Sequence, residues 1–561
     1  MALSLFSTKL NTHLAPHLRP AISILRRYCA AQNAVVQSGE DSVKVEYPPI
    51  VDQSKAAVAE RQKLAWHEQV KNCLTIEEKL IKVNMPAYWG LRTTPLVNDE
   101  YHYNCFPYFQ HWTRTQYENG LPSGWFKSSA EKVDGLVNSI REQIIEAISF
   151  QYQGFRREYE SNVKLSDEEK TRLRTAQICK DLNRIIIKSL YSIAPHLEES
   201  EVDIEPRHEA FWMVGGIEPP EDKKIWIERK TPLTDEEKNE PVDRPFQYAG
   251  KPILSVRNRL PLEPVIDDLE SEAFDVEEIP KSRCDPQGLG YRRVYQHVRT
   301  IPGFWPGSEH EFGQLCYHNR HKYKIAYNEI DPVDQQNALK AQAILNSFGW
   351  LIGQAYYQGF STFNELTYPL TTQTIITDGQ NWSFYVYQLN TTVFETVHFD
   401  RNRRANKCWG TEELKLFEEI DENGKVIGFN DEVLRYLIQF YLTEPKERNY
   451  DMKPYLGTDE QTIADIDHVE RRAFLEQNYK HLMSGKPRHR KDLVPEVYLW
   501  EWIYKIKFDT RPIDARRRFF ELNQDPWDRR LDDYHPLYIP RNERIGGYHD
   551  KKNKWRAKYW P

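Results

Sequence analysis

The chain has 561 residues, of which 76 are Lys or Arg and 83 are Asp or Glu, so its formal net charge is −7 at pH 7. A protein that binds mainly a phosphate backbone is basic overall, and any nucleic-acid contact here must therefore come from local patches. No apolar run is long enough for a transmembrane helix. Abundant Trp and Tyr together with 33 Pro predict long ordered segments bound to a partner and only a limited central core.

The first 39 residues contain no Asp or Glu. They carry four basic side chains: Lys9, Arg19, Arg26 and Arg27. This Ser-containing, acid-free composition is typical of a mitochondrial targeting segment, predicted here at 1–28 with cleavage after Tyr28. A secretory signal is disfavoured because Pro16 and Pro20 interrupt the apolar residues. An unstructured terminus that lacks acids by chance is the open alternative. Residues 29–53 are predicted to be an extended lead-in.

Two helices are predicted within residues 54–83, with a break near 72–75. Thr75 and Glu78 have the spacing of a capping box, in which the first hydroxyl accepts from the backbone three residues later. Residues 84–127 are rich in aromatic side chains and show no clear periodicity, so this segment is predicted to be irregular.

Two amphipathic helices are expected next. Ser128 with Glu131 opens the first, and Ser166 with Glu169 opens the second, which runs to Tyr191. Apolar residues recur on one face of the first helix: Val133, Leu136, Val137, Ile140, Ile144 and Ile148.

The following segment has weaker signals. Residues 211–214 form a short apolar run that predicts a strand ended by Gly215-Gly216. Residues 217–285 alternate Pro-rich and charged blocks, and the seven acids within 267–278 predict a solvated loop.

A long helix is expected after Asp334, its predicted cap, with Gly349 and Gly353 allowing close approach of another element. Its apolar stripe consists of Ala341, Ile344, Leu345, Phe348, Leu351, Ile352 and Ala355. An Asp378-Gly379 turn between the β-prone runs 374–377 and 382–387 predicts a hairpin, because Gly tolerates the positive φ of a tight turn.

One more helix is predicted after Asn430, its N-cap. Its inward residues are Val433, Leu434, Leu437, Ile438 and Tyr441. Beyond a boundary at 445–455, Thr458 with Gln461 could begin a helix that runs to Met483. The predicted fold class is α+β, with long amphipathic helices, a β-hairpin-containing sheet and extended N- and C-terminal arms. The predicted domains are the targeting segment 1–28, the lead-in 29–53, a core at 54–450 and a helical, basic-aromatic extension at 451–561.

Sequence motifs give little support for an enzyme. No phosphate-binding G-x-x-x-x-G-K-[ST] loop and no G-x-S-x-G nucleophile elbow occurs. Cys316, His318 and His321 form C-x-H-x-x-H, with His297 and His310 as the nearest additional candidates, but the spacing is not that of a standard zinc finger. Polar residues at the edge of a helix or loop explain the pattern better.

Acid pairs and cysteines are interpreted as ordinary features. The pairs at 277–278 and 418–419 lie in charged, turn-rich surroundings, whereas general acid–base chemistry needs a dry cleft. The seven cysteines are dispersed, and no C-x-x-C occurs, which fits a reducing compartment. We expect no catalytic residue, no metal and no cofactor.

Clusters of basic and aromatic residues are better candidates, for contact with RNA. Basic side chains neutralise phosphates, and aromatic rings stack on unpaired bases. The candidates are Arg401, Arg403, Arg404, Lys407, Lys486, Arg488, Arg490, Lys491, Arg516, Arg517, Arg518, Lys551, Lys552, Lys554, Trp555, Arg556, Lys558 and Trp560. The alternative is a charged tail that only interacts with water.

Several segments together resemble one family. The hairpin segment TTQTIITDGQNWSFYVYQLNTT is followed by NKCWGTEELKLFEEID and GFNDEVLRYLIQFYLTEPKE, and the N-terminal YPPIVDQSKAA and the later GQAYYQGF fit as well. Over roughly residues 45–450 the chain resembles the mitochondrial ribosomal proteins of the programmed cell death protein nine family, once numbered thirty among small-subunit proteins.

The resemblance implies a non-catalytic structural component of the mitochondrial large ribosomal subunit, in the matrix, without a cofactor or membrane contact. It also implies a peripheral position towards the stalk by which spent tRNA leaves. The implied partners are the related large-subunit protein number thirty-seven, other ribosomal proteins, and large-subunit rRNA through local basic patches. Two alternatives stay open: a matrix enzyme with an unrecognised site, and a free-standing RNA-binding adaptor.

Overall fold

The chain divides into two compact units, Met1–Cys73 and Leu74–Pro561. The computed structural model describes residues 51–83, 90–97, 104–159, 166–219, 239–271, 273–274, 276–297, 300–304, 308–320, 331–362, 364–399, 402–421, 424–457, 462–473 and 475. In the first unit these include α3 (Lys55–Lys71), which begins where the hydroxyl of Ser54 accepts from Ala57 N at 3.3 Å. Helix α3 ends before Asn72, at the predicted break.

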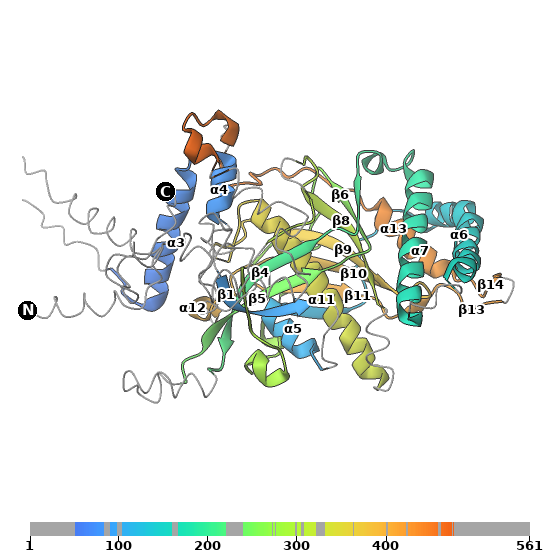
Figure 1. Cartoon of the computed structure of the whole chain (residues 1–561), viewed down its shortest axis with the longest axis horizontal. Helices are drawn as coiled ribbons and strands as arrows, with labels where there is room; N and C mark the ends of the chain where they lie inside the picture. The colour runs from blue at the N-terminus through green and yellow to red at the C-terminus, as the bar shows by residue number, and fades with distance from the viewer. Residues whose placement is uncertain are drawn as a thin grey trace, which may run out of the picture. The chain divides into compact units, whose positions relative to one another are not determined.

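Within the described residues, the second unit is built on two mixed sheets (Figure 1). The larger sheet contains β2 (Thr115–Asn119), β11 (Asn406–Gly410), β10 (Asn381–Leu389), β9 (Leu370–Thr377), β8 (Phe312–Asn319), β6 (Leu254–Asn258) and β3 (Glu201–Ile204) in that spatial order, and β12 (Leu414–Lys415) pairs with β10. The smaller sheet has the order β4 (His208–Ile217), β5 (Val242–Gly250), β1 (Gly90–Val97) and β7 (Val294–His297). Strands β13 (Glu419–Ile420) and β14 (Val426–Ile427) form a separate pair.

The described helices of this unit are α4 (Ile76–Val83), α5 (Phe106–Thr113), α6 (Ala130–Tyr159), α7 (Asp167–Leu190), α11 (Pro332–Tyr357), α12 (Thr396–Phe399) and α13 (Asp431–Leu442). Short 3-10 turns lie at Pro195–Leu197, Val276–Glu278, Pro286–Leu289 and Ile463–Asp465. The predicted α+β class is confirmed. The targeting segment at 1–28 lies outside the described residues, as does the lead-in up to residue 50.

The β9–β10 hairpin lies in the middle of the larger sheet, as predicted. Gly379 in its turn has φ +93°, a conformation that other residues adopt only with strain. Neighbouring residues along β9 face opposite cores, because Ile375 packs with α6, α7 and α13 while Ile376 packs with α11. Both faces of this sheet are therefore covered, and its central strands are buried from end to end.

Helix α11 lies between the two sheets and is almost entirely buried from Ala338 to Tyr357. A Cβ atom at Gly349 would come within 2.2 Å of the Tyr248 ring on β5, which confirms the expected close approach. On the side of the larger sheet, Ser347 Oγ lies 2.7 Å from Thr374 Oγ1 on β9. The helix is thus the element that joins the sheets.

The start of α11 differs from its prediction. The side chain of Asp331, and not that of Asp334, caps the helix by accepting from Val333 N at 3.0 Å. Pro332 follows the cap and favours the earlier start, because its fixed φ suits the first helical position. A Cβ atom at Gly353 would lie 3.4 Å from the backbone of Pro302, which is an ordinary van der Waals distance. The close approach expected at Gly353 is therefore not a tight one.

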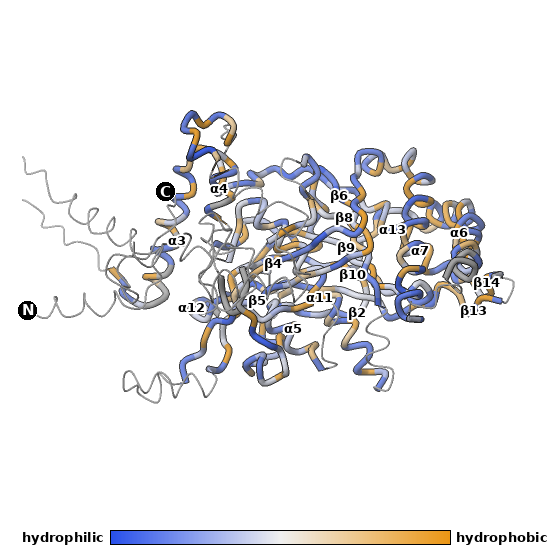
Figure 2. Tube along the Cα trace, viewed as in Figure 1, coloured by the Kyte–Doolittle hydropathy of each residue, from blue (hydrophilic) through white to orange (hydrophobic). Residues whose placement is uncertain are grey.

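Helices α6, α7 and α13 cover the other face of the larger sheet, and hydrophilic and hydrophobic residues alternate along them (Figures 1 and 2). The capping box predicted for α7 is present, since Ser166 and Glu169 exchange side-chain to backbone hydrogen bonds of 3.2 Å. Asn430 caps α13 by accepting from the backbone of Glu432 at 2.9 Å. The inward residues predicted for α6 and α13 all belong to this core, although Leu136 is only partly buried.

The prediction that residues 84–127 are irregular is wrong for the described part. This part contains β1, α5 and β2. Each strand pairs in parallel with a partner distant in sequence, β1 with β5 and β2 with β11. The aromatic residues of α5 fill the core, where Trp112 is fully buried.

Residues 208–285 also contain more β-structure than expected. Strand β4 passes through Gly215 and Gly216 with an irregular register between Val214 and Ile217, and β5 and β6 follow. Glycine is needed at 215, because a Cβ atom there would lie 2.1 Å from the backbone nitrogen of Thr396. The acidic loop at 267–278 is mostly exposed in its described part, as predicted.

The expected limited core is wrong. Two large clusters of buried hydrophobic residues lie on either side of the larger sheet. Four tryptophans are among the fully buried side chains: Trp112, Trp212, Trp350 and Trp382. The tryptophans therefore serve this chain's own packing in the described residues.

Residues that follow the family-like segment pack on α4 and on the end of α11, within the second unit. Lys79 Nζ on α4 donates to Leu456 O at 2.6 Å, and Glu78 accepts from Arg471 Nη2 at 2.5 Å. Leu456 is fully buried, next to Gly359 at the end of α11. The domain boundary near residue 450 stays a prediction.

The helix predicted from Thr458 is not continuous in its described part. Residues 458–461 lie outside the described residues, and Ile463–Asp465 form a 3-10 turn. Helical structure begins only at Val469. The capping interaction predicted for this segment is made by Thr462 and Asp465 instead.

Candidate functional site

Two residues of the first predicted basic cluster, at 401–407, form ion pairs within the protein. Arg404 pairs with Glu270 at 3.3 Å. Lys407 is 7% exposed and pairs with Glu118 at 2.8 Å. Arg403 is exposed. Two of these charges therefore connect the acidic loop and an edge strand to the sheet, and Arg403 is the described member best placed to meet a partner.

The other predicted RNA-binding residues are outside the part of the chain that the structure describes. They are Arg401, Lys486, Arg488, Arg490, Lys491, Arg516, Arg517, Arg518, Lys551, Lys552, Lys554, Trp555, Arg556, Lys558 and Trp560. Their contact with RNA stays a prediction.

Cys316 and His318 lie on β8 and are buried, with Sγ and Nε2 3.2 Å apart. Burial raises the pKa of the Cys316 thiol and lowers the pKa of His318 to about 3, so both groups are neutral at physiological pH. His321 lies outside the described residues. Among the residues described, no group of three His, Cys, Asp or Glu side chains could hold a metal ion.

The two acid pairs lie at the surface. Glu277, Glu278, Glu418 and Glu419 are exposed, and Glu278 accepts from the side-chain amide of Gln116. Such exposed carboxylates lack the dry surroundings that general acid–base catalysis needs.

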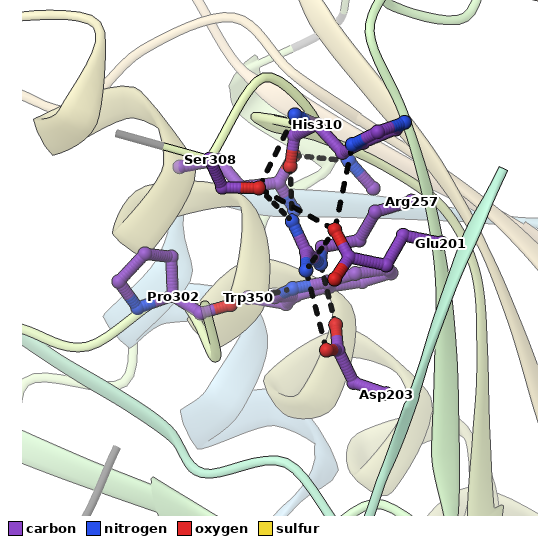
Figure 3. Close-up of polar contacts among 9 residues, drawn as sticks. Glu201, Asp203, Arg257, Pro302, Ser308, His310 and Trp350 are labelled. Atoms are coloured by element: carbon purple, nitrogen blue, oxygen red, sulfur yellow. Dashed lines mark hydrogen bonds and ion pairs between the residues drawn. The ribbon is translucent and has the colours of Figure 1, made fainter. Parts of the chain in front are cut away.

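A cluster of polar residues surrounds the buried Arg257 on β6 (Figure 3). The guanidinium donates through Nε and Nη2 to the Asp203 carboxylate, and Nη2 also lies 3.1 Å from Glu201 Oε2. Nη1 donates to Ser308 Oγ at 3.2 Å and to the carbonyl of His310. All the donors of this guanidinium are thus engaged, and none is left for a substrate anion. The cluster is a structural anchor that binds β3, β6 and the segment before β8.

A second contact holds the same segment. Trp350 Nε1 on α11 donates to Pro302 O at 3.1 Å, and the His208 ring stacks on Trp350 with centroids 4.9 Å apart. Burial lowers the pKa of His208, and the nearby His318 and Arg257 lower it further. A neutral imidazole therefore packs against the indole. No local pattern in the sequence indicates the Arg257 anchor, because its acidic partner lies 54 residues away.

A row of basic side chains on α7 is absent from the residues predicted above. We define the α7 basic stripe by its residues: Lys170, Lys180, Arg184 and Lys188. At 100° per residue these lie on the side of α7 opposite to its buried residues Ile178, Leu182 and Ile186. Arg174 lies closer to the buried face, and its guanidinium is 4.1 Å from the centroid of the Tyr152 ring on α6. The signal that could have found the stripe is the recurrence of basic residues at four-residue steps.

One known family matches most of the chain. A family model described as "Mitochondrial 28S ribosomal protein S30 (PDCD9)" matches residues 14–445. In the described residues, no helix is both long and apolar enough to cross a membrane.

Proposed function

The chain belongs to the family described as mitochondrial 28S ribosomal protein S30 (PDCD9), and we propose from this that it is a non-catalytic structural component of the mitochondrial large ribosomal subunit in the matrix. The match over residues 14–445 is the observation that carries the proposal, because it spans both sheets and the helices that cover them. A mitochondrial ribosomal protein follows from the family alone. The subunit, the partners and the structural role go further and need their own support.

The description of the family names the small subunit, whereas several sequence segments of this chain resemble a protein placed in the large subunit. We favour the large subunit because those segments include the hairpin β9–β10, in the middle of the larger sheet, and helix α13, which covers one face of that sheet. The net charge of −7 suits a peripheral protein held mostly by protein neighbours, among them the related large-subunit protein number thirty-seven.

Gradient sedimentation of a mitochondrial lysate tests the proposal. The tagged full-length chain is followed together with the large- and small-subunit rRNAs at a Mg²⁺ concentration that keeps the subunits apart. We expect it to move with the large subunit, and to leave those fractions when EDTA unfolds the particle. Migration with the small subunit would refute the subunit assignment. A position near the top of the gradient would refute the ribosomal role and favour a matrix enzyme or a free RNA-binding adaptor.

A further inference from the structure

We propose that the α7 basic stripe is a docking surface for the phosphate backbone of ribosomal RNA. The inference rests on the proposed ribosomal role, and it names a surface for rRNA that family membership does not assign. It is independent of the basic patches beyond residue 485.

The first argument is the arrangement of the charges. Lys180, Arg184 and Lys188 follow one another at four-residue steps, which keeps them on one side of the helix. From Lys170 to Lys188 the stripe runs for about 27 Å at 1.5 Å per residue. Cations along one side of a helix match a polymer that carries a charge on every unit.

The second argument is that two of these charges are available. The Arg184 side chain is 76% exposed and lies 3.1 Å from Asp181, a carboxylate that also accepts from Gln151. The Lys180 side chain is 22% exposed and pairs with Glu205. Lys188 is exposed and has no hydrogen bond or ion pair within the described residues. Because the side chains of Arg184 and Lys188 reach solvent, their charged groups can turn to phosphates at little cost.

The third argument is contrast with the surroundings. Residues 170–191 contain six basic side chains and one acidic one, in a chain whose net charge is −7. Neighbouring α6 presents acids and bases together, with Glu131, Glu142 and Glu146 all exposed. A helix that is merely solvated would resemble α6.

The stripe also has clear limits. Asp167, Glu168 and Glu169 stand in the first turn of α7, where they complement the helix dipole and end the basic surface. At the other end Tyr191 is 52% exposed, and its ring is accessible for stacking on an unpaired base.

The test uses the full-length chain and mitochondrial rRNA transcribed in vitro, with affinity measured over a series of KCl concentrations. The variant Arg184→Gln/Lys188→Gln removes two charges from the stripe. Its matched control, Lys132→Gln/Lys425→Gln, removes two exposed charges from α6 and from the segment before β14. Each lost phosphate contact flattens the slope of log affinity against log salt by about 0.7–0.9. We expect a change of about 1.4–1.8 for the stripe variant and none for the control.

Two results would overturn the inference. One is an equal slope of log affinity against log salt for the stripe variant and the wild type. The other is a wild-type chain that binds neither the large-subunit nor the small-subunit rRNA. Ultraviolet crosslinking in the intact ribosome is the second arm. Crosslinks from α7 to rRNA are expected, whereas crosslinks from α7 only to an acidic protein would also overturn it. A chain that co-sediments with a ribosomal subunit but gives no α7–rRNA crosslink refutes this inference alone, while loss of co-sedimentation refutes the proposed function.

Discussion

At the scale of single residues, buried charge is the feature that most distinguishes this protein. Arg257 is 2% exposed, and its partners lie on β3 and in the segment before β8. The desolvation of such a group is compensated only when every donor finds an acceptor. The cluster therefore fixes the relative positions of three segments but has little tolerance for the loss of one member.

Arg257→Met should lower the free energy of unfolding by about 3 kcal/mol, because it leaves the Asp203 carboxylate, with 22% of its side chain exposed, without its guanidinium. Arg259→Met is the matched control, since Arg259 and Glu309 form an exposed pair and should contribute less than about 1 kcal/mol. Urea unfolding of the full-length chain, followed by tryptophan fluorescence, measures both. Equal losses would show that Arg257 contributes no more than a surface charge.

Residue-scale interactions are mostly beyond prediction from the sequence. Caps such as Ser166 and Asn430 are predictable, because their partners lie two or three residues away. Arg404 and Lys407 resemble RNA ligands in the sequence, but their acidic partners lie far along the chain and show only in the folded structure. The spacing of residues in the sequence identifies basic side chains, but the group that each one contacts is known only from the folded structure.

At the scale of elements, the hairpin turn is a precise point of contact between β9–β10 and α7. A Cβ atom at Gly379 would lie 3.2 Å from Thr175 Oγ1 on α7, and φ is +93°. Gly379→Val should therefore cost about 1–3 kcal/mol of stability through backbone strain alone. Thermal unfolding measures it, with Gly135→Ala on α6 as the control, where the added methyl group meets open space. An unchanged melting temperature for Gly379→Val would show that the turn tolerates side chains.

The segment after residue 450 is predicted to be essential to the fold up to residue 475. A chain that ends after residue 450 loses the hydrogen bond from Lys79 to Leu456 O, worth about 1.5–3 kcal/mol for a charged donor. It also loses the burial of the Leu456 side chain, worth about 1.5–3 kcal/mol. A chain that ends after residue 480 keeps both. Melting temperatures and ribosome incorporation of the two truncations decide the matter, and equal stability would show that this packing is dispensable.

Elements are predictable where their signal is local. Amphipathic helices α6, α7 and α13 and the β9–β10 hairpin contain their own periodicity or turn. Strands β1, β2, β5 and β6 escape prediction, because each depends on partners far along the chain and β6 is buried on both faces, which removes the alternation of polar and apolar residues.

At the scale of the whole molecule, the mean hydropathy of −0.73 is misleading, because it does not show where the apolar residues gather. The same composition places two dense cores on either side of one sheet. The acid-free, basic N-terminal segment affects the whole molecule in another way, because it is predicted to direct the protein into mitochondria.

Replacing Arg19, Arg26 and Arg27 with Glu should leave the protein outside mitochondria, because import depends on a cationic segment. Uptake into isolated mitochondria, scored by protease protection, measures this. The control places three glutamates at the exposed positions Lys132, Arg403 and Lys425 and should be imported normally. Protection of the N-terminal variant equal to that of the wild type would refute the targeting segment.

The pairing of β2 with β11 has a consequence for how the protein matures. Residues 115–119 find their partner only at 406–410, so this strand remains an unpaired edge while nearly three hundred further residues emerge. Such non-local pairing slows folding and exposes aggregation-prone edges in the meantime. We therefore expect β2 to join the larger sheet late, after β9, β10 and β11 have been made, and we expect its open edge to need protection by chaperones until then.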